Sequence, residues 1–271
     1  MSKTRLDLLL VSRGLATDQH LAQSLVMAGQ VRIDGQVVLQ PARAVSPDAQ
    51  VSVDTGPRFV SRGGEKLAAA LQAFDLSPAG LVCADVGAST GGFTDCLLQA
   101  GAARVYAIDV GKGILDWKLR VDPRVVVLEG TNARSLDRLP EPVNLVTLDA
   151  SFISLKVLLP VVCGWLPSSG GQVVALIKPQ FEAGRQDVAR GRGVIRDPAI
   201  HRQVLLDVLG YAQEINFDLL GLLRSPLLGP KGNTEFLAWL SYPMLPSPAS
   251  FNLDFLIARV LAPSSPPPES A

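Results

Sequence analysis

Two carboxylates and a group of glycines stand where a nucleotide could be bound. The apolar run Val82–Ala84 ends at Asp85, and three glycines lie within Gly87–Gly92, just before helical spacing begins. A strand, a glycine turn and a helix N-terminus in this order build nucleotide pockets at the carboxyl ends of parallel strands. Asp109 ends the next apolar run, near the spacing of roughly 20 residues from which a carboxylate reaches ribose hydroxyls. The pattern predicts a nucleoside-binding site.

The glycine spacing separates two classes of nucleotide-binding protein. Dehydrogenases place Gly-x-Gly-x-x-Gly around a pyrophosphate, and the loop Gly87–Gly92 lacks that pattern. Adjacent glycines suit a ligand without phosphates, such as S-adenosyl-L-methionine, whose amino-acid part would face the backbone. A purely structural strand–helix turn is the competing interpretation. The residues predicted to hold the cofactor are Asp85, Gly87, Ala88, Ser89, Thr90, Gly91, Gly92, Phe93, Asp109, Val110 and Asn132.

Three further apolar runs also end in charged residues. Residues 125–129 end at Glu129, residues 143–149 end at Asp149, and residues 171–177 are followed by Lys178. The carboxyl ends of parallel strands meet at one edge of a sheet, so we expect these side chains beside the glycine loop. One charged strand end is an ordinary surface feature, whereas several at one edge predict chemistry there.

A cationic segment follows the last of these strands. Between residues 182 and 196 the arginines outnumber the acidic residues. Glycines interrupt the segment at 184, 191 and 193, which favours a loop. We predict that it contacts RNA phosphates, with a solvated surface loop as the alternative.

The length and composition of the chain allow a hydrophobic core large enough to position these elements. The chain has 271 residues, of which 48% are hydrophobic, so it can bury a full core. Basic and acidic residues number 25 each, so a nucleic-acid partner would meet a local basic face rather than an overall positive field. Cys83, Cys96 and Cys163 lack metal-type spacing, which predicts no metal site and a reducing, cytoplasmic location. No apolar run reaches the ~18 residues of a membrane span.

The N-terminal residues predict a separate small domain. Apolar positions recur at helical spacing over residues 5–26, and alternating strands follow at Val31–Val38 and Val51–Val53. The stretches Arg5-Leu-Asp-Leu-Leu-Leu-Val-Ser-Arg13-Gly-Leu and Ala28-Gly29-Gln-Val31-Arg-Ile-Asp-Gly35 resemble the S4 RNA-binding domain. This resemblance implies that basic side chains of the domain contact structured RNA.

From Ser61 to Tyr242 the chain resembles the TlyA branch of FtsJ-like RNA 2′-O-methyltransferases. The motifs, in the order of that family, are Ser61-Arg-Gly-Gly-Glu-Lys66-Leu, Asp85-Val-Gly-Ala-Ser-Thr-Gly-Gly-Phe-Thr-Asp95, Asp149-Ala-Ser-Phe-Ile-Ser154, Lys178-Pro-Gln-Phe-Glu182 and Lys231-Gly-Asn-Thr-Glu235. A preceding S4 domain is also the arrangement of this branch. The resemblance implies an α/β Rossmann-like S-adenosylmethionine-dependent methyltransferase fold with a small α+β S4-like N-terminal domain.

The same resemblance implies a catalytic tetrad of Lys66, Asp149, Lys178 and Glu235. A ribose 2′-hydroxyl is a poor nucleophile until its proton is withdrawn, whereas the sulfonium of the donor is already a good methyl electrophile. Lys178 is the predicted base, the two carboxylates would orient the lysines, and Lys66 would position the hydroxyl and stabilise developing negative charge.

The implied cofactor is S-adenosyl-L-methionine, and the implied partner is ribosomal RNA or a ribosomal subunit, with cytidine ribose as the target. The residues predicted to contact RNA are Arg5, Arg13, Arg32, Arg62, Arg185, Arg190 and Arg192. Two other classes of function compete with this one. A haemolysin-type protein would need a membrane-active surface, and a non-catalytic RNA-binding or ribosome assembly factor would need no donor.

The predicted domain organisation has four parts. Residues 1–56 form the S4-like RNA-binding domain and residues 57–61 a linker. Residues 62–245 form the methyltransferase domain, and residues 246–271 form a proline-rich C-terminal tail.

Overall fold

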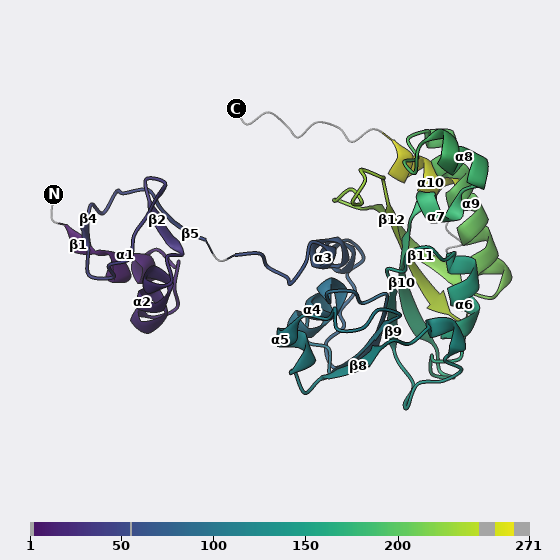
Figure 1. The fold of residues 1–271 in the computed structure, drawn as a ribbon, viewed down its shortest axis with the longest axis horizontal. Helices are drawn as coiled ribbons and strands as arrows, with labels where there is room; N and C mark the ends of the chain where they lie inside the picture. Colours follow the sequence, from purple (N-terminus) through teal and green to yellow (C-terminus); the bar gives the residue numbers. More distant parts are fainter. Residues whose placement is uncertain (1–2, 55, 244–252, 263–271) are drawn as a thin grey trace. The chain divides into compact units, whose positions relative to one another are not determined.

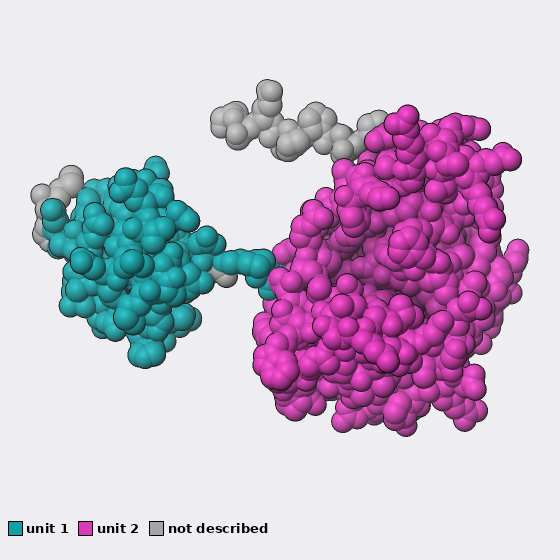
Figure 2. All heavy atoms as spheres, in the orientation of Figure 1, with its two compact units in different colours: residues 1–58 teal, residues 59–271 magenta. Residues whose placement is uncertain are grey.

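The computed structural model describes residues 3–54, 56–243 and 253–262. The chain divides into two compact units, residues 1–58 and residues 59–271 (Figure 1, Figure 2). One hydrophobic cluster lies within unit 1, and two lie within unit 2. Each unit therefore has a core of its own.

Unit 1 is an α+β domain of two helices and short strands. Its elements are β1 (Thr4–Arg5), α1 (Leu6–Ser12), α2 (Gln19–Met27), β2 (Val31–Ile33), β3 (Gln36–Val37), β4 (Ala44–Val45) and β5 (Val51–Val53). Strand β2 pairs antiparallel with β3 and β5, and β1 pairs with β4. Asp18 caps α2 by accepting a hydrogen bond from the backbone N–H of Leu21. The two helices and the hairpin predicted from the sequence are both present.

A buried carboxylate joins the two helices of unit 1. Asp7 is fully buried and accepts hydrogen bonds from Arg5, Gln19 and Gln23. The guanidinium of Arg5, 2.7 Å away, is the main cause that holds the pKa of Asp7 well below its usual range. A buried charge is tolerated only with partners of this kind. One predicted RNA-binding arginine thus also stabilises the fold.

Unit 2 is built on a twisted seven-stranded sheet. Its strands are β6 (Val82–Val86), β7 (Arg104–Asp109), β8 (Val125–Glu129), β9 (Leu145–Leu148), β10 (Gly171–Ile177), β11 (Asp218–Arg224) and β12 (Phe236–Tyr242). They lie in the order β11-β12-β10-β9-β6-β7-β8. Strand β12 is antiparallel to both of its neighbours, and the β8-to-β10 part is parallel throughout. This confirms the predicted Rossmann-like α/β fold.

Helices cover both faces of this sheet (Figure 1). The helices of unit 2 are α3 (Gly63–Ala73), α4 (Gly92–Gln99), α5 (Trp117–Arg120), the 3-10 helix η1 (Ala133–Ser135), α6 (Leu155–Cys163), α7 (Pro179–Glu182), α8 (Arg185–Arg190), α9 (Pro198–Glu214) and α10 (Leu253–Leu261). Helices α3, α4 and α5 share one core with alternate sheet residues, and α6, α9 and α10 share the other. Strands buried on both faces explain the continuous apolar runs in the sequence.

Two segments differ from the simplest interpretation of the sequence. Phe59, within the predicted linker, is buried against Gly64 of α3, and Val60 N donates to Asp95 on α4 at 2.9 Å. Helix α10 lies within the predicted tail, and its Leu256 and Ile257 are buried against α9 and β11. Residues 246–252 and 263–271 of that tail lie outside the described residues.

The predicted loop between residues 182 and 196 contains helix α8. Within the part of the chain that the structure describes, no helix is both long and apolar enough to cross a membrane.

Candidate active site

The candidate site lies at the carboxyl ends of β6 and β9. The chain runs outward from β6 to β7 and β8 and then returns to the other side of β6 to form β9. Ligands of doubly wound sheets bind at such a reversal of strand order. Gly87, with φ +82°, brings the two loops together there, because a Cβ at this position would lie 2.7 Å from the backbone oxygen of Asp149.

Three cavities meet at this point, and Gly87, Ser89 and Asp149 line all of them. The first, of about 240 Å³, lies between the glycine loop and the start of α3. The second, of about 480 Å³, lies over the ends of β7 and β8. The third, of about 690 Å³, opens toward Lys178 and Glu235. The site therefore has separate compartments joined at Asp149.

The second cavity has the features of a nucleoside pocket. Val110 and Ile114 are exposed apolar residues in its wall, and Asn132, on the loop after β8, also lines it. The carboxylate of Asp109 is fixed at its mouth because it accepts hydrogen bonds from Ser89 N at 2.8 Å and Gly111 N at 2.7 Å. This combination of apolar wall and fixed acceptor suits a nucleoside without phosphates.

Glu129 braces the loop that forms this wall. Its carboxylate accepts hydrogen bonds from the backbone N–H groups of Gly113, Ile114 and Leu115 at 2.8–3.0 Å. These bonds, with Leu115 N and Arg120 as leading contributors, lower the pKa of Glu129 to about 2. The charged strand end thus positions a cavity wall.

Nine of the eleven residues predicted to hold the cofactor line the first two cavities, and Asp85 and Gly91 do not. Asp85 is fully buried, and its carboxylate accepts hydrogen bonds from Thr94 at 2.7 Å and Thr147 at 3.0 Å. Burial raises the pKa of Asp85 to about 7. Gly91 caps α4 with φ +99° and packs against Leu119. In this structure both residues support the pocket from within the fold.

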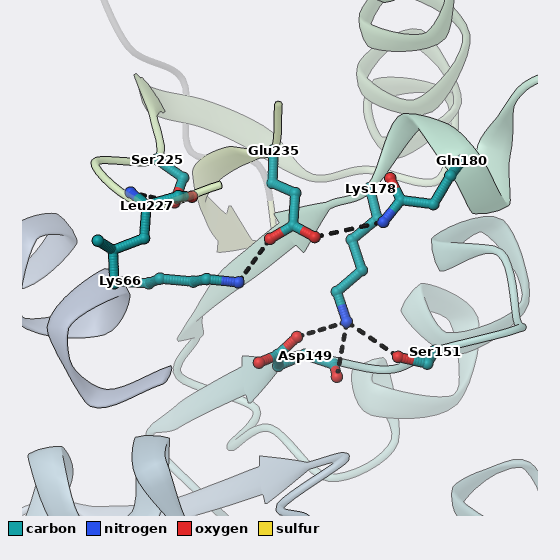
Figure 3. A network of polar contacts seen from close by, with 8 residues as sticks. All are labelled: Lys66, Asp149, Ser151, Lys178, Gln180, Ser225, Leu227 and Glu235. Carbon is teal, nitrogen blue, oxygen red and sulfur yellow. Dashed lines mark hydrogen bonds and ion pairs between the residues drawn. The ribbon is translucent and has the colours of Figure 1, made fainter. Parts of the chain in front are cut away.

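The four predicted tetrad residues form two adjacent ion pairs (Figure 3). Lys66 on α3 places Nζ 2.5 Å from Oε2 of Glu235, which directly precedes β12. Lys178, at the end of β10, places Nζ 2.6 Å from Oδ1 of Asp149, at the end of β9. Glu235 is 1% exposed and both lysines are 8% exposed, so these charges are largely removed from water. Residues far apart in sequence are brought together at one sheet edge.

Burial and the neighbouring lysines shift the pKa of Asp149 in opposite directions. Removal from water raises the pKa of the Asp149 carboxyl, while the nearby ammonium of Lys178 favours the charged form. Lys178 Nζ also donates to the backbone oxygen of Asp149 at 3.2 Å and to Ser151 Oγ at 3.1 Å. Three oxygens therefore surround this amine, namely the carboxylate and backbone oxygens of Asp149 and the hydroxyl of Ser151.

Three residues near the tetrad were not singled out from the sequence. Ser151 accepts from Lys178, and Gln180 Nε2 donates to Glu235 Oε1 at 3.3 Å (Figure 3). Asn233 is buried within the predicted motif Lys231–Glu235 and binds the backbone of the preceding cationic segment. All three lie inside motifs that the sequence analysis identified, and this was the available signal. The sequence did not show the direction in which their side chains point.

An aromatic pair stands between the second and third cavities. Phe152 is 90% exposed with φ +63°, and its ring centroid lies 4.9 Å from that of Phe181. Phe152 lines both cavities, and Phe181 lines the third. An exposed phenyl ring in a left-handed conformation is an unfavourable state that active sites retain more often than other surfaces do.

The arginines predicted to contact RNA fall into two groups. In unit 1, Arg13 donates to the backbone oxygens of Pro47 and Ala49, and Arg32 donates to the oxygen of Gly35. In unit 2, Arg62 lines the first cavity. Arg185, Arg190 and Arg192 are exposed on residues 184–196, which we call the arginine segment; Val188 and Gly193 of this segment line the third cavity.

Comparisons with known proteins find relatives of both units of this chain. The FtsJ-like methyltransferase model matches residues 59–242, and the S4 domain model matches residues 4–51. The 16S/23S rRNA (cytidine-2′-O)-methyltransferase TlyA of Mycobacterium tuberculosis is 48% identical over 242 residues, which is 88% of this chain and 90% of that protein. Hemolysin A of Brachyspira hyodysenteriae is 39% identical over 86% of this chain and 98% of its own length.

A solved structure from Streptococcus thermophilus, named as a candidate hemolysin, is 40% identical. It aligns over 96% of each chain with a TM-score of 0.69. The similarity therefore extends over both units of the sequence and is not confined to the sheet.

Proposed function

Because the chain belongs to the FtsJ-like methyltransferase family, in its TlyA branch, we propose that it methylates a ribose 2′-hydroxyl of ribosomal RNA, with cytidine as the target nucleotide. The observation that carries this proposal is that two lysine–carboxylate pairs lie where the three cavities meet at Asp149. The name of the Mycobacterium relative supplies the substrate class.

The residues of the first two cavities fit S-adenosyl-L-methionine. Asp109 would accept hydrogen bonds from the ribose hydroxyls, Asn132 would contact the adenine edge, and Val110 and Ile114 would cover the base. The glycine loop and Arg62, at the start of α3, would face the amino-acid part. A Cβ at Gly87, which lines both cavities, would lie 2.7 Å from the backbone oxygen of Asp149, so the glycine lets the two loops approach each other there. The donor would supply a methyl group already activated on a sulfonium.

The tetrad would act on the acceptor hydroxyl from the third cavity. Lys178 would withdraw the proton of the 2′-hydroxyl once it has passed its own proton to solvent, and Asp149 would keep its amine at the cavity junction. Lys66, held by Glu235, would donate to the hydroxyl oxygen and stabilise its developing charge. Burial of both pairs keeps them aligned and strengthens their electrostatic effect.

RNA would be held by both units. Unit 1, as an S4 domain, would contact structured RNA, and the exposed arginines of unit 2 would bind phosphates beside the third cavity. Since ribosomal RNA is the proposed substrate, we propose the cytoplasm as the place of action.

Replacement of Lys178 tests the mechanism. We expect Lys178→Ala to reduce transfer of labelled methyl groups to ribosomal subunits by at least about 1,000-fold, because base and alignment are lost together. Lys178→Arg should be similarly inactive, since a guanidinium does not give up its proton. Donor affinity, measured by calorimetry, should change by less than about threefold because Lys178 lies outside the first two cavities.

Lys118→Ala is the matched control, because Lys118 is an exposed lysine with a 3.7 Å contact to Asp95. It should retain activity. Full activity of Lys178→Ala would remove this lysine from the mechanism. Mapping 2′-O-methyl nucleotides on treated subunits then tests the target, and absence of methylated cytidine would refute the proposed substrate.

A further inference from the structure

The arginine segment is fastened to the active site at both of its ends. At its N-terminal end, α7 follows directly after Lys178, and Glu182 on α7 accepts hydrogen bonds from Ser154 Oγ at 2.6 Å and Leu155 N at 2.8 Å. At its C-terminal end, Ile195 is buried and held by side chains from two other elements. The segment thus has two fixed points.

Asn233 forms the C-terminal attachment. Its side chain is 2% exposed, accepts a hydrogen bond from Ile195 N at 2.9 Å and donates one to Gly193 O at 2.9 Å. The ring of His201 on α9 meets the oxygen of Ile195 at 3.0 Å. Both backbone groups of Ile195 are therefore bound by side chains, an arrangement that fixes a loop in one position.

Between these attachments the segment relies on local bonds. Helix α8 has no buried residue, and Gly193 N donates to Val188 O within the segment at 2.8 Å. Val188 and Gly193 nevertheless line the third cavity. The positions of Arg185, Arg190 and Arg192 relative to that cavity consequently depend on the two ends.

The C-terminal attachment is also adjacent to the tetrad. Asn233 precedes Glu235 by two residues, and Glu235 is held by Lys66 at 2.5 Å and by Gln180 at 3.3 Å. The turn that holds the C-terminal end of the arginine segment therefore also carries a tetrad carboxylate.

We propose that Asn233 is a positioning residue for the RNA substrate, which fixes the arginine segment over the third cavity so that bound phosphates are in register with the tetrad. This rests on the proposed function, since it takes RNA as the substrate. Asn233 acts through the arginines, and its own amide need not touch the RNA.

A double-mutant cycle tests this inference. The variants are Asn233→Ala, the pair Arg190→Gln with Arg192→Gln, and all three changes together. Methyl transfer to purified ribosomal subunits gives kcat and KM, and filter binding without donor gives the affinity for the same subunits. We expect Asn233→Ala to raise KM for the subunits roughly 10- to 100-fold, since the two hydrogen bonds of a buried side chain are lost.

With the two arginines already removed, Asn233→Ala should add less than about threefold, because the groups that it positions are absent. Asn233→Asp keeps the acceptor for Ile195 N but opposes Gly193 O with a second oxygen, so its KM should lie between those of the parent and Asn233→Ala. Equal effects of Asn233→Ala in both backgrounds would overturn the inference, because the residue would then act independently of the arginines.

Asn144→Ala separates a purely structural effect from positioning. Asn144 Oδ1 accepts from Val82 N at 3.3 Å at the opposite ends of the strands. This control should lower the melting temperature without raising KM for the subunits, and a raised KM in it would overturn the inference. If the parent protein binds the subunits but transfers no methyl group to them, the proposed function is refuted. The double-mutant cycle measured by filter binding then still decides the role of Asn233.

Discussion

At the scale of single residues, the carboxylates at the site have two kinds of partner. Asp149 and Glu235 each pair with a lysine, whereas Asp85 accepts hydrogen bonds from Thr94 and from the hydroxyl of Thr147. Breaking a buried ion pair by removing one partner leaves an uncompensated charge, so the two pairs are costly to alter. Asp85 can instead avoid that cost by taking up a proton.

The pH dependence of stability should reveal this behaviour of Asp85. Its folded pKa, raised to about 7 mainly by burial, exceeds the ordinary unfolded value of about 3.9. The folded state therefore binds more protons than the unfolded state between these two pH values. The stabilising contribution of Asp85 to the free energy of unfolding is complete below about pH 4 and is lost as pH rises through about 7. Asp85→Asn should remove this term.

Urea unfolding of the parent and of Asp85→Asn at several pH values measures the effect. The free energy of unfolding of the variant, relative to the parent, should increase by about 1 kcal/mol per pH unit from about pH 5 to pH 7 and then level off. Parallel pH profiles would show that Asp85 does not titrate in this range.

The family resemblance named the four residues that the structure brings together in two ion pairs, but the sequence did not predict the direction of Asp85. Each strand end could be located because apolar runs stop at charged residues. Alternate residues of a strand face opposite sides of the sheet, however, and the sequence does not say which side holds the cavity. Asp85 points toward Thr94 of α4, so it supports the pocket instead of lining it.

At the scale of elements, the close contact of the β6 and β9 loops determines the shape of the donor pocket. We expect Gly87→Ala to weaken donor binding at least about tenfold, because its Cβ would lie 2.7 Å from Asp149 O and 3.1 Å from the Cα of Ala150. The residue also has φ +82°, where a side chain adds strain of roughly 1 kcal/mol.

Gly80→Ala is the control for strain alone. Gly80 has φ +73°, and a Cβ there would meet no atom within 4 Å. Its donor affinity should match that of the parent while its stability falls by roughly 1 kcal/mol. Calorimetry with S-adenosyl-L-methionine distinguishes the two variants, and equal affinities would mean that the loops can separate without harm to the pocket.

The parallel strands were predictable from the sequence, whereas the position of β12 was not. Continuous apolar runs predict buried strands, and their polar ends predict one functional edge. The insertion of β12 between β10 and β11 depends on pairing partners distant in sequence, which no local pattern specifies. Helix α10 follows a proline-rich stretch of the sequence, and it is held in the fold by burial of Leu256 and Ile257 and by the ion pair of Asp254 with Arg202 on α9.

At the scale of the whole molecule, the chain has two units, to which we assign RNA recognition and chemistry as part of the proposed function. Residues that line the three cavities all belong to unit 2, which has two cores of its own. In unit 1, Arg5 and Arg13 hold Asp7 and the loop at Pro47 in place, so their charges serve the domain as well as any RNA. The sequence predicted the division but not this internal use of the arginines.

Removal of unit 1 should therefore separate donor binding from RNA methylation. Residues 57–271 keep Phe59 in its site on α3, so donor affinity should remain within about twofold of the full chain. Methyl transfer to ribosomal subunits should fall at least about tenfold, mainly through KM, because tethering gives the second RNA contact an effective concentration near the millimolar range.

Adding residues 1–56 as a separate chain at micromolar concentration should not restore the rate, since the advantage comes from the covalent connection. Calorimetry for the donor and methyl incorporation into subunits give the two readings. An unchanged kcat/KM for residues 57–271 would show that unit 1 contributes nothing to substrate recognition. A lost donor affinity would show that the pocket needs unit 1 for its shape, although unit 2 supplies every residue of its walls.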